Sequence, residues 1–71
     1  MILKETVKDK IWEYEYYNNG MHHLCGADVL VRNIKILKRA KRILADIILR
    51  FEDKTERYDE CEYSFECLRM T

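Results

Sequence analysis

The sequence predicts an α+β fold with the element order ββαβ. Three observations support this prediction: alternating aromatic and acidic residues before an Asn-Gly pair, apolar residues at helical spacing in the middle of the chain, and a second alternating segment near its end. With 71 residues, the chain has room for one domain, residues 1–71, whose core is expected to be thin.

Residues 10–31 are predicted to form a β-hairpin. Asn19 and Gly20 tolerate the positive φ angles that a type I′ turn requires at its two central positions, and this turn suits the twist of antiparallel strands. The aromatic residues before the turn alternate with glutamates, as in a half-buried strand: Trp12, Tyr14 and Tyr16.

A helix over residues 3–17 is the competing interpretation of the same segment. Leu3, Val7, Ile11 and Tyr14 follow one another at spacings of four, four and three, which places them on one helical face. Gly20 would then lie just past the C-cap of the helix instead of in a hairpin turn. The aromatic alternation favours the hairpin.

Residues Ile34–Phe51 are predicted to form one amphipathic helix, with Asn33 as its N-cap. The apolar stripe at about 100° per residue consists of Ile36, Leu37, Ala40, Ile43, Leu44, Ile47, Ile48 and Phe51. The opposite, basic side of this helix is expected to carry Lys35, Lys38, Arg39 and Arg42.

Alternation resumes after a polar connector and predicts a third strand. Cys61, Tyr63, Phe65 and Cys67 would lie on the buried face, and Glu60, Glu62, Ser64 and Glu66 on the other. Because a crossover helix between parallel strands is right-handed, we expect the third strand beside the first, in the order 2-1-3, with the helix covering one face of the sheet.

The chain has no net charge, but its charges are segregated along the sequence. Residues 28–50 hold seven basic and two acidic residues, whereas residues 51–71 hold seven acidic and three basic ones. A basic helix face and an acidic strand face are therefore the predicted partner-binding surfaces. Their residues are Lys35, Lys38, Arg39, Arg42, Glu60, Glu62 and Glu66.

We expect no enzyme activity, metal or cofactor. His22 and His23 would point to opposite faces of a strand, and Cys61 and Cys67 would lie about 20 Å apart in an extended strand, so neither pair could chelate one zinc ion. The sequence contains no nucleophile elbow, glycine-rich phosphate loop or spaced pair of catalytic acids. Buried thiols are the simpler interpretation of the cysteines.

A cytoplasmic location is predicted, because no stretch is long and apolar enough to span a bilayer and the first residues do not resemble a secretory signal. Three cysteines in such a chain indicate free thiols in a reducing compartment. Because so small a core gains burial by self-association, we also expect a homodimer.

Segregated charge without catalytic residues leads to the functional hypothesis. The chain is expected to be a small interaction module that binds a macromolecular partner, most readily a protein, as an adaptor or inhibitor of the kind that phages and mobile elements encode. The alternative is a nucleic-acid-binding protein whose basic residues contact phosphates. Binding to a membrane is not expected.

Overall fold

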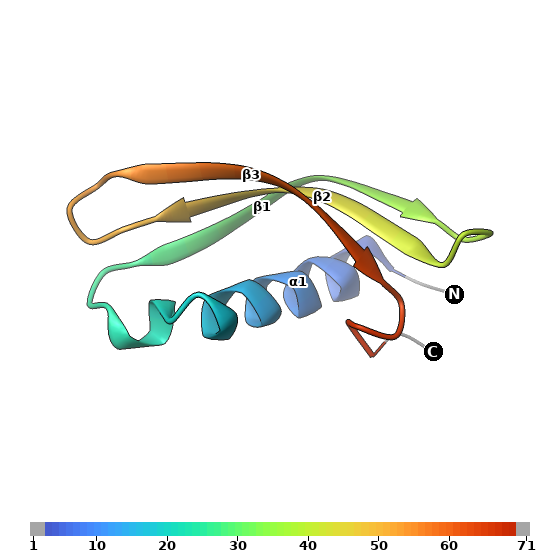
Figure 1. Cartoon of the computed structure of the whole chain (residues 1–71), viewed down its shortest axis with the longest axis horizontal. Helices are drawn as coiled ribbons and strands as arrows, with labels where there is room; N and C mark the ends of the chain where they lie inside the picture. The colour runs from blue at the N-terminus through green and yellow to red at the C-terminus, as the bar shows by residue number, and fades with distance from the viewer. Residues whose placement is uncertain (1–2, 70–71) are drawn as a thin grey trace.

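The computed structural model describes residues 3–69, as one helix packed on one face of a three-stranded antiparallel sheet (Figure 1). Helix α1 spans Lys4–Asn18, and a short 3-10 helix, η1, follows at Met21–His23. The strands are β1 (Asp28–Leu37), β2 (Arg42–Arg50) and β3 (Glu56–Ser64). The α+β class is confirmed, but the helix precedes every strand, so the predicted order ββαβ is wrong.

Helix α1 occupies the segment for which the sequence predicted the first strand of a hairpin. Val7 and Ile11, four residues apart, are fully buried against the sheet, while Tyr17 stays 54% exposed. The helix ends at the C-cap Asn19, and Gly20 follows in the left-handed conformation with φ 68°. The hairpin predicted over residues 10–31 is therefore wrong, and the competing helical interpretation is correct.

Strands β1 and β2 form a hairpin where the sequence predicted a single helix over Ile34–Phe51. The inward side chains of β2 alternate along the strand and are nearly fully buried: Ile43, Ala45, Ile47 and Leu49. Asn33 is not an N-cap, because it lies at a bulge in β1 with φ 54°. Isoleucine and valine supply four of the ten residues of β1, and isoleucine three of the nine of β2, which agrees with their β propensity.

Strand β3 confirms the predicted third strand, although it runs from Glu56 to Ser64, and Phe65 and Cys67 lie in the turn that follows. The strand order is β1-β2-β3, with both pairs antiparallel, so the predicted order 2-1-3 is wrong. A crossover helix does not exist between these strands, and tight turns therefore place each strand beside the next.

The core lies between α1 and the inward face of the sheet. α1 and η1 contribute Val7, Ile11 and Met21, each with no exposed surface, and Leu68 closes the core from the turn after β3. Because the sheet has a helix on one side only, its other side is uncovered within residues 3–69 (Figure 1). None of the described helices is long and apolar enough to cross a membrane.

Candidate functional site

The uncovered side of the sheet, called the open face below, is defined by the strand register. Residues paired across the three strands form rows, in which each β2 residue lies between one β1 residue and one β3 residue. The rows are Asp28–Arg50–Glu56, Leu30–Ile48–Tyr58, Arg32–Asp46–Glu60, Lys35–Leu44–Glu62 and Leu37–Arg42–Ser64.

Apolar side chains occupy one full row and parts of two others on the open face. Tyr58 is 59% exposed and Leu37 is 43% exposed, whereas Ile48, between Leu30 and Tyr58, is only 6% exposed. In the described part of the chain, no other element lies over this face. Ile48 is therefore shielded by its neighbours in the sheet. Apolar groups and charges are thus interleaved on a surface open to water.

A bulge in β1 organises the centre of the open face. The ladder shifts between Arg32 and Lys35, and the amide Nδ2 of Asn33 donates a hydrogen bond of 2.7 Å to Oδ2 of Asp46. The hydroxyl of Tyr58 donates to the same oxygen at 3.4 Å. Asparagine suits this position, because its short polar side chain tolerates the left-handed backbone better than most residues do.

We expect Asn33→Ala to lower the free energy of unfolding by about 1–2 kcal/mol, because alanine loses both the side-chain hydrogen bond and the tolerance for positive φ. Asn33→Gly should cost less than alanine, since glycine retains that tolerance. Urea unfolding of both variants checks the prediction. An equal or larger loss for glycine would show that backbone conformation does not decide this position.

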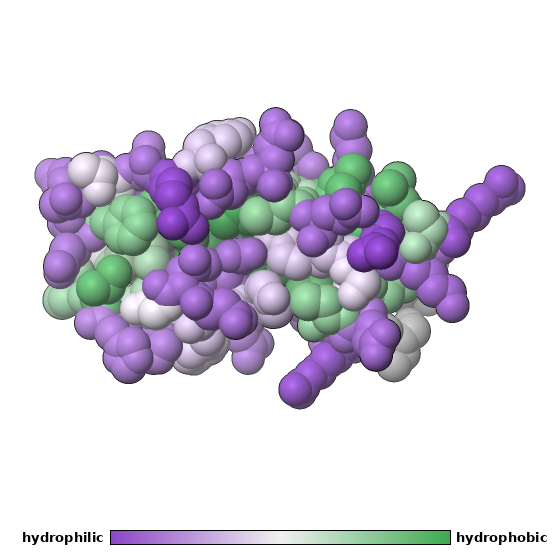
Figure 2. Space-filling view, in the orientation of Figure 1, coloured by the Kyte–Doolittle hydropathy of each residue, from purple (hydrophilic) through white to green (hydrophobic). Residues whose placement is uncertain are grey.

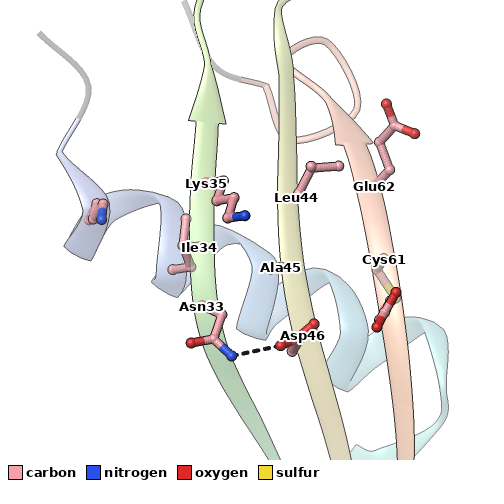
Figure 3. Close-up of a pocket in the computed structure, with 10 residues that line it drawn as sticks. Asn33, Ile34, Lys35, Leu44, Ala45, Asp46, Cys61 and Glu62 are labelled. Carbon is pink, nitrogen blue, oxygen red and sulfur yellow. Dashed lines mark hydrogen bonds between the residues drawn. The ribbon is translucent and has the colours of Figure 1, made fainter.

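An open groove with a volume of about 840 Å³ is lined by residues of all three strands, from both sides of the sheet, and by Lys4 of α1 (Figure 3). It contains charges of both signs beside apolar side chains, so it matches a ligand surface that also mixes charge and apolar groups. The lining residues are Lys4, Asn33, Ile34, Lys35, Leu44, Ala45, Asp46, Glu60, Cys61 and Glu62.

The turn between β1 and β2 carries a cluster of cations, called the basic tip below: Lys38, Arg39 and Lys41. This turn projects beyond the N-terminal end of α1 (Figure 1), and long hydrophilic side chains extend from the same end of the molecule (Figure 2). All three residues are exposed. Within residues 3–69, none of them forms an ion pair.

The predicted site residues lie in other places than the sequence indicated. Lys35 and Arg42 lie on the open face, and Lys38 and Arg39 lie in the basic tip, so the predicted basic helix face is wrong. Glu60 and Glu62 lie on β3, whereas Glu66 follows its end. The structure does not keep the two charge groups on separate surfaces, because Arg42 Nε lies 3.9 Å from Glu62 Oε1.

The inward side of β3 bonds to α1 through a tyrosine and a glutamate that the sequence did not indicate. The hydroxyl of Tyr63 donates a 2.7 Å hydrogen bond to Glu15 Oε1, and the Asn19 amide donates one of 2.7 Å to Oε2. Burial, followed by the bond to Glu15, raises the pKa of Tyr63 above its ordinary value of 10.0. Burial also raises the pKa of the Cys61 thiol. The hydrogen bond from Tyr63 to Glu15 joins β3 to helix α1.

His22 and His23 do not point to opposite faces, because they lie in η1 with ring centroids 3.8 Å apart. Cys25 and Cys67 are exposed and Cys61 is half-buried, so the expectation of buried thiols is wrong for two of the three. The described part of the chain contains no group of three or more potential metal ligands.

Comparison with known proteins adds no functional information. The chain matches no family model, no curated protein and no solved structure. The two surfaces described above, the open face and the basic tip, are therefore the basis for a functional proposal.

Proposed function

We propose that this protein acts by binding a macromolecular partner through its basic tip, and that the partner is a protein with an acidic surface. The observation that supports the proposal is the projecting turn with Lys38, Arg39 and Lys41, whose charges have no ion-pair partner within residues 3–69. Such a cluster attracts an anionic surface and increases the rate of association. The role is that of an adaptor or inhibitor in the cytosol.

Acidic residues beside the tip favour a protein over a nucleic acid. The backbone N–H of Phe65 donates a 3.1 Å hydrogen bond to the carbonyl oxygen of Lys41, which brings the chain around Glu66 close to the tip. Glu62 of β3 lies beside Arg42, the residue that directly follows the basic tip. A long polyanion would meet these carboxylates as well as the cations, whereas a limited acidic patch on a protein can avoid them.

Charge reversal at the tip tests the proposal. Wild-type protein, Lys38→Glu/Arg39→Glu and the control Lys8→Glu/Lys10→Glu are immobilised and exposed to nuclease-treated cell extract at about 0.15 M salt. The control makes the same charge change on α1. We expect wild type and control to retain an acidic protein, and the tip variant to retain at least about tenfold less. Mass spectrometry identifies the retained protein. If the tip variant retained the same acidic protein as strongly as wild type does, the proposal would be contradicted.

Nucleic acid is the second candidate, favoured by the same three cations because they can contact adjacent phosphates. Fluorescence anisotropy with a duplex DNA and a single-stranded RNA of about 20 nucleotides distinguishes it. Phosphate contacts predict binding that weakens steeply between low and physiological salt and is lost in the tip variant. Absence of binding at low salt would exclude this candidate.

A further inference from the structure

The open face is self-complementary in charge. At two successive levels, β1 carries a cation and β3 carries an anion: Arg32 and Glu60 in one row, and Lys35 and Glu62 in the next. We propose that a second copy of this chain covers the open face, in a symmetric dimer whose two-fold axis runs parallel to β2 between the two sheets. This dimer does not depend on the proposed partner of the basic tip.

The two-fold axis determines which residues meet. A half-turn about an axis parallel to the strands keeps every row at its own level but exchanges the two sides of the sheet. The β1 side of one copy therefore faces the β3 side of the other. Arg32 then faces Glu60 of the second copy, and Lys35 faces Glu62 of the second copy, each twice per dimer.

Apolar groups meet in the neighbouring row of the same arrangement. Leu30 faces Tyr58 of the second copy, and Ile48 faces its own copy, so the 59% exposed ring of Tyr58 becomes covered. Asp46 also faces its own copy, which opposes association. Because Arg32 of each copy lies in the same row, two cations accompany these two carboxylates.

Pairing through sheet edges is less favourable than this face-to-face contact. Antiparallel pairing of β3 with its own copy would bring the glutamates of two acidic strands together, and pairing of β1 would do the same for its cations. The bulge between Arg32 and Lys35 also interrupts the β1 edge. The face-to-face arrangement instead pairs cations with anions at the two central levels. At the ends of the face, Asp28 faces Glu56 of the second copy with Arg50 between them, and Arg42 faces its own copy.

The size of the face predicts a weak dimer. Three strands of about nine residues cover about 30 by 14 Å, which is roughly half of the 800 Å² per partner in a standard protein interface. Association is therefore expected in the micromolar range and above. Because the axis runs along the strands, both basic tips would point the same way, and one anionic partner could contact both.

Complementary charge reversals test the dimer. Variant A is Arg32→Glu/Lys35→Glu, and variant B is Glu60→Lys/Glu62→Lys. At the two substituted levels, the charges on the β1 and β3 sides that face each other are all negative in a dimer of A alone and all positive in a dimer of B alone. Sedimentation equilibrium up to several hundred micromolar should show at least about tenfold weaker self-association for each variant than for wild type. An equimolar mixture of A and B should associate again, because each β1 side then faces an opposite β3 side.

The mixture of A and B distinguishes loss of the interface from misfolding, because misfolded chains would not restore a specific dimer. Lys38→Glu/Arg39→Glu is the matched control, because it reverses two charges in the tip, outside the open face. It should dimerise like wild type even if it loses the proposed partner. Monomeric wild type at several hundred micromolar, or a mixture of A and B that stays monomeric, would overturn the dimer and leave the proposed function of the tip unaffected.

Discussion

Replacing Ile43 with alanine is expected to lower the free energy of unfolding by about 2–5 kcal/mol. Ile43 has no exposed surface and lies in β2 between Ile36 of β1 and Tyr63 of β3. Alanine would leave a cavity in the centre of the sheet. Because the core of so short a chain is thin, this loss would be a large share of a total stability near the lower end of about 5–15 kcal/mol.

Urea unfolding followed by circular dichroism measures this loss, and Leu37→Ala is its control. Leu37 lies six residues before Ile43 in the same hairpin and is 43% exposed, so its truncation should change stability by only about 0.5 kcal/mol. If the segment were instead one amphipathic helix, both residues would lie on its apolar stripe. Similar losses for the two variants would therefore contradict the hairpin.

Tyr63→Phe is expected to lower stability by about 1–2 kcal/mol at neutral pH, because the Glu15 carboxylate then loses a 2.7 Å hydrogen bond. The larger effect of this substitution, on the pH dependence of stability, should appear at alkaline pH. The folded pKa of Tyr63 is raised above the unfolded value of 10.0, so the phenol is neutral in both states below pH 10. Above that pH the unfolded chain loses a proton that the folded chain keeps, and stability falls.

The measurement is the slope of unfolding free energy against pH between about 8 and 11. One such proton contributes up to about 1.4 kcal/mol per pH unit, and Tyr63→Phe should remove that contribution. Tyr58→Phe is the control, because it removes the hydroxyl of a tyrosine that is 59% exposed and lies outside the core. Equal slopes for wild type and Tyr63→Phe would show that the phenol ionises alike in both states.

The error over residues 34–51 has an identifiable physical origin. Leu44 and Ile48 lie on the open face, yet they are apolar, so they conceal the alternation of the buried residues on either side of them. Together they produce spacings of three and four that imitate a helix. The turn at residues 38–41 contains no glycine, proline, asparagine or aspartate, and Lys41 adopts a φ of 53° in place of such a residue.

The error over residues 10–17 arose from the aromatic residues. Trp12 and Tyr16 are four apart and stack at 4.5 Å on α1, while Tyr14 lies 38% exposed beside Tyr63. Their alternation with glutamates was compatible with a strand. Asn19 and Gly20 suit a helix C-terminus as well as a hairpin turn, so local sequence could not choose between them.

The sequence alone determined the α+β class and the third strand. It singled out Lys38 and Arg39 of the basic tip, but not Lys41, and Lys35, Glu60 and Glu62 of the open face, but not Arg32. Clear alternation in residues 60–63 was sufficient for β3, because Glu60 and Glu62 are exposed whereas Cys61 and Tyr63 face the core. Tertiary structure decided the rest. Pairing of β1 with β2 and burial of Val7 and Ile11 under the sheet selected between local patterns that fit both helix and strand. Long-range pairing also placed Arg42 beside Glu62, which no local pattern encodes.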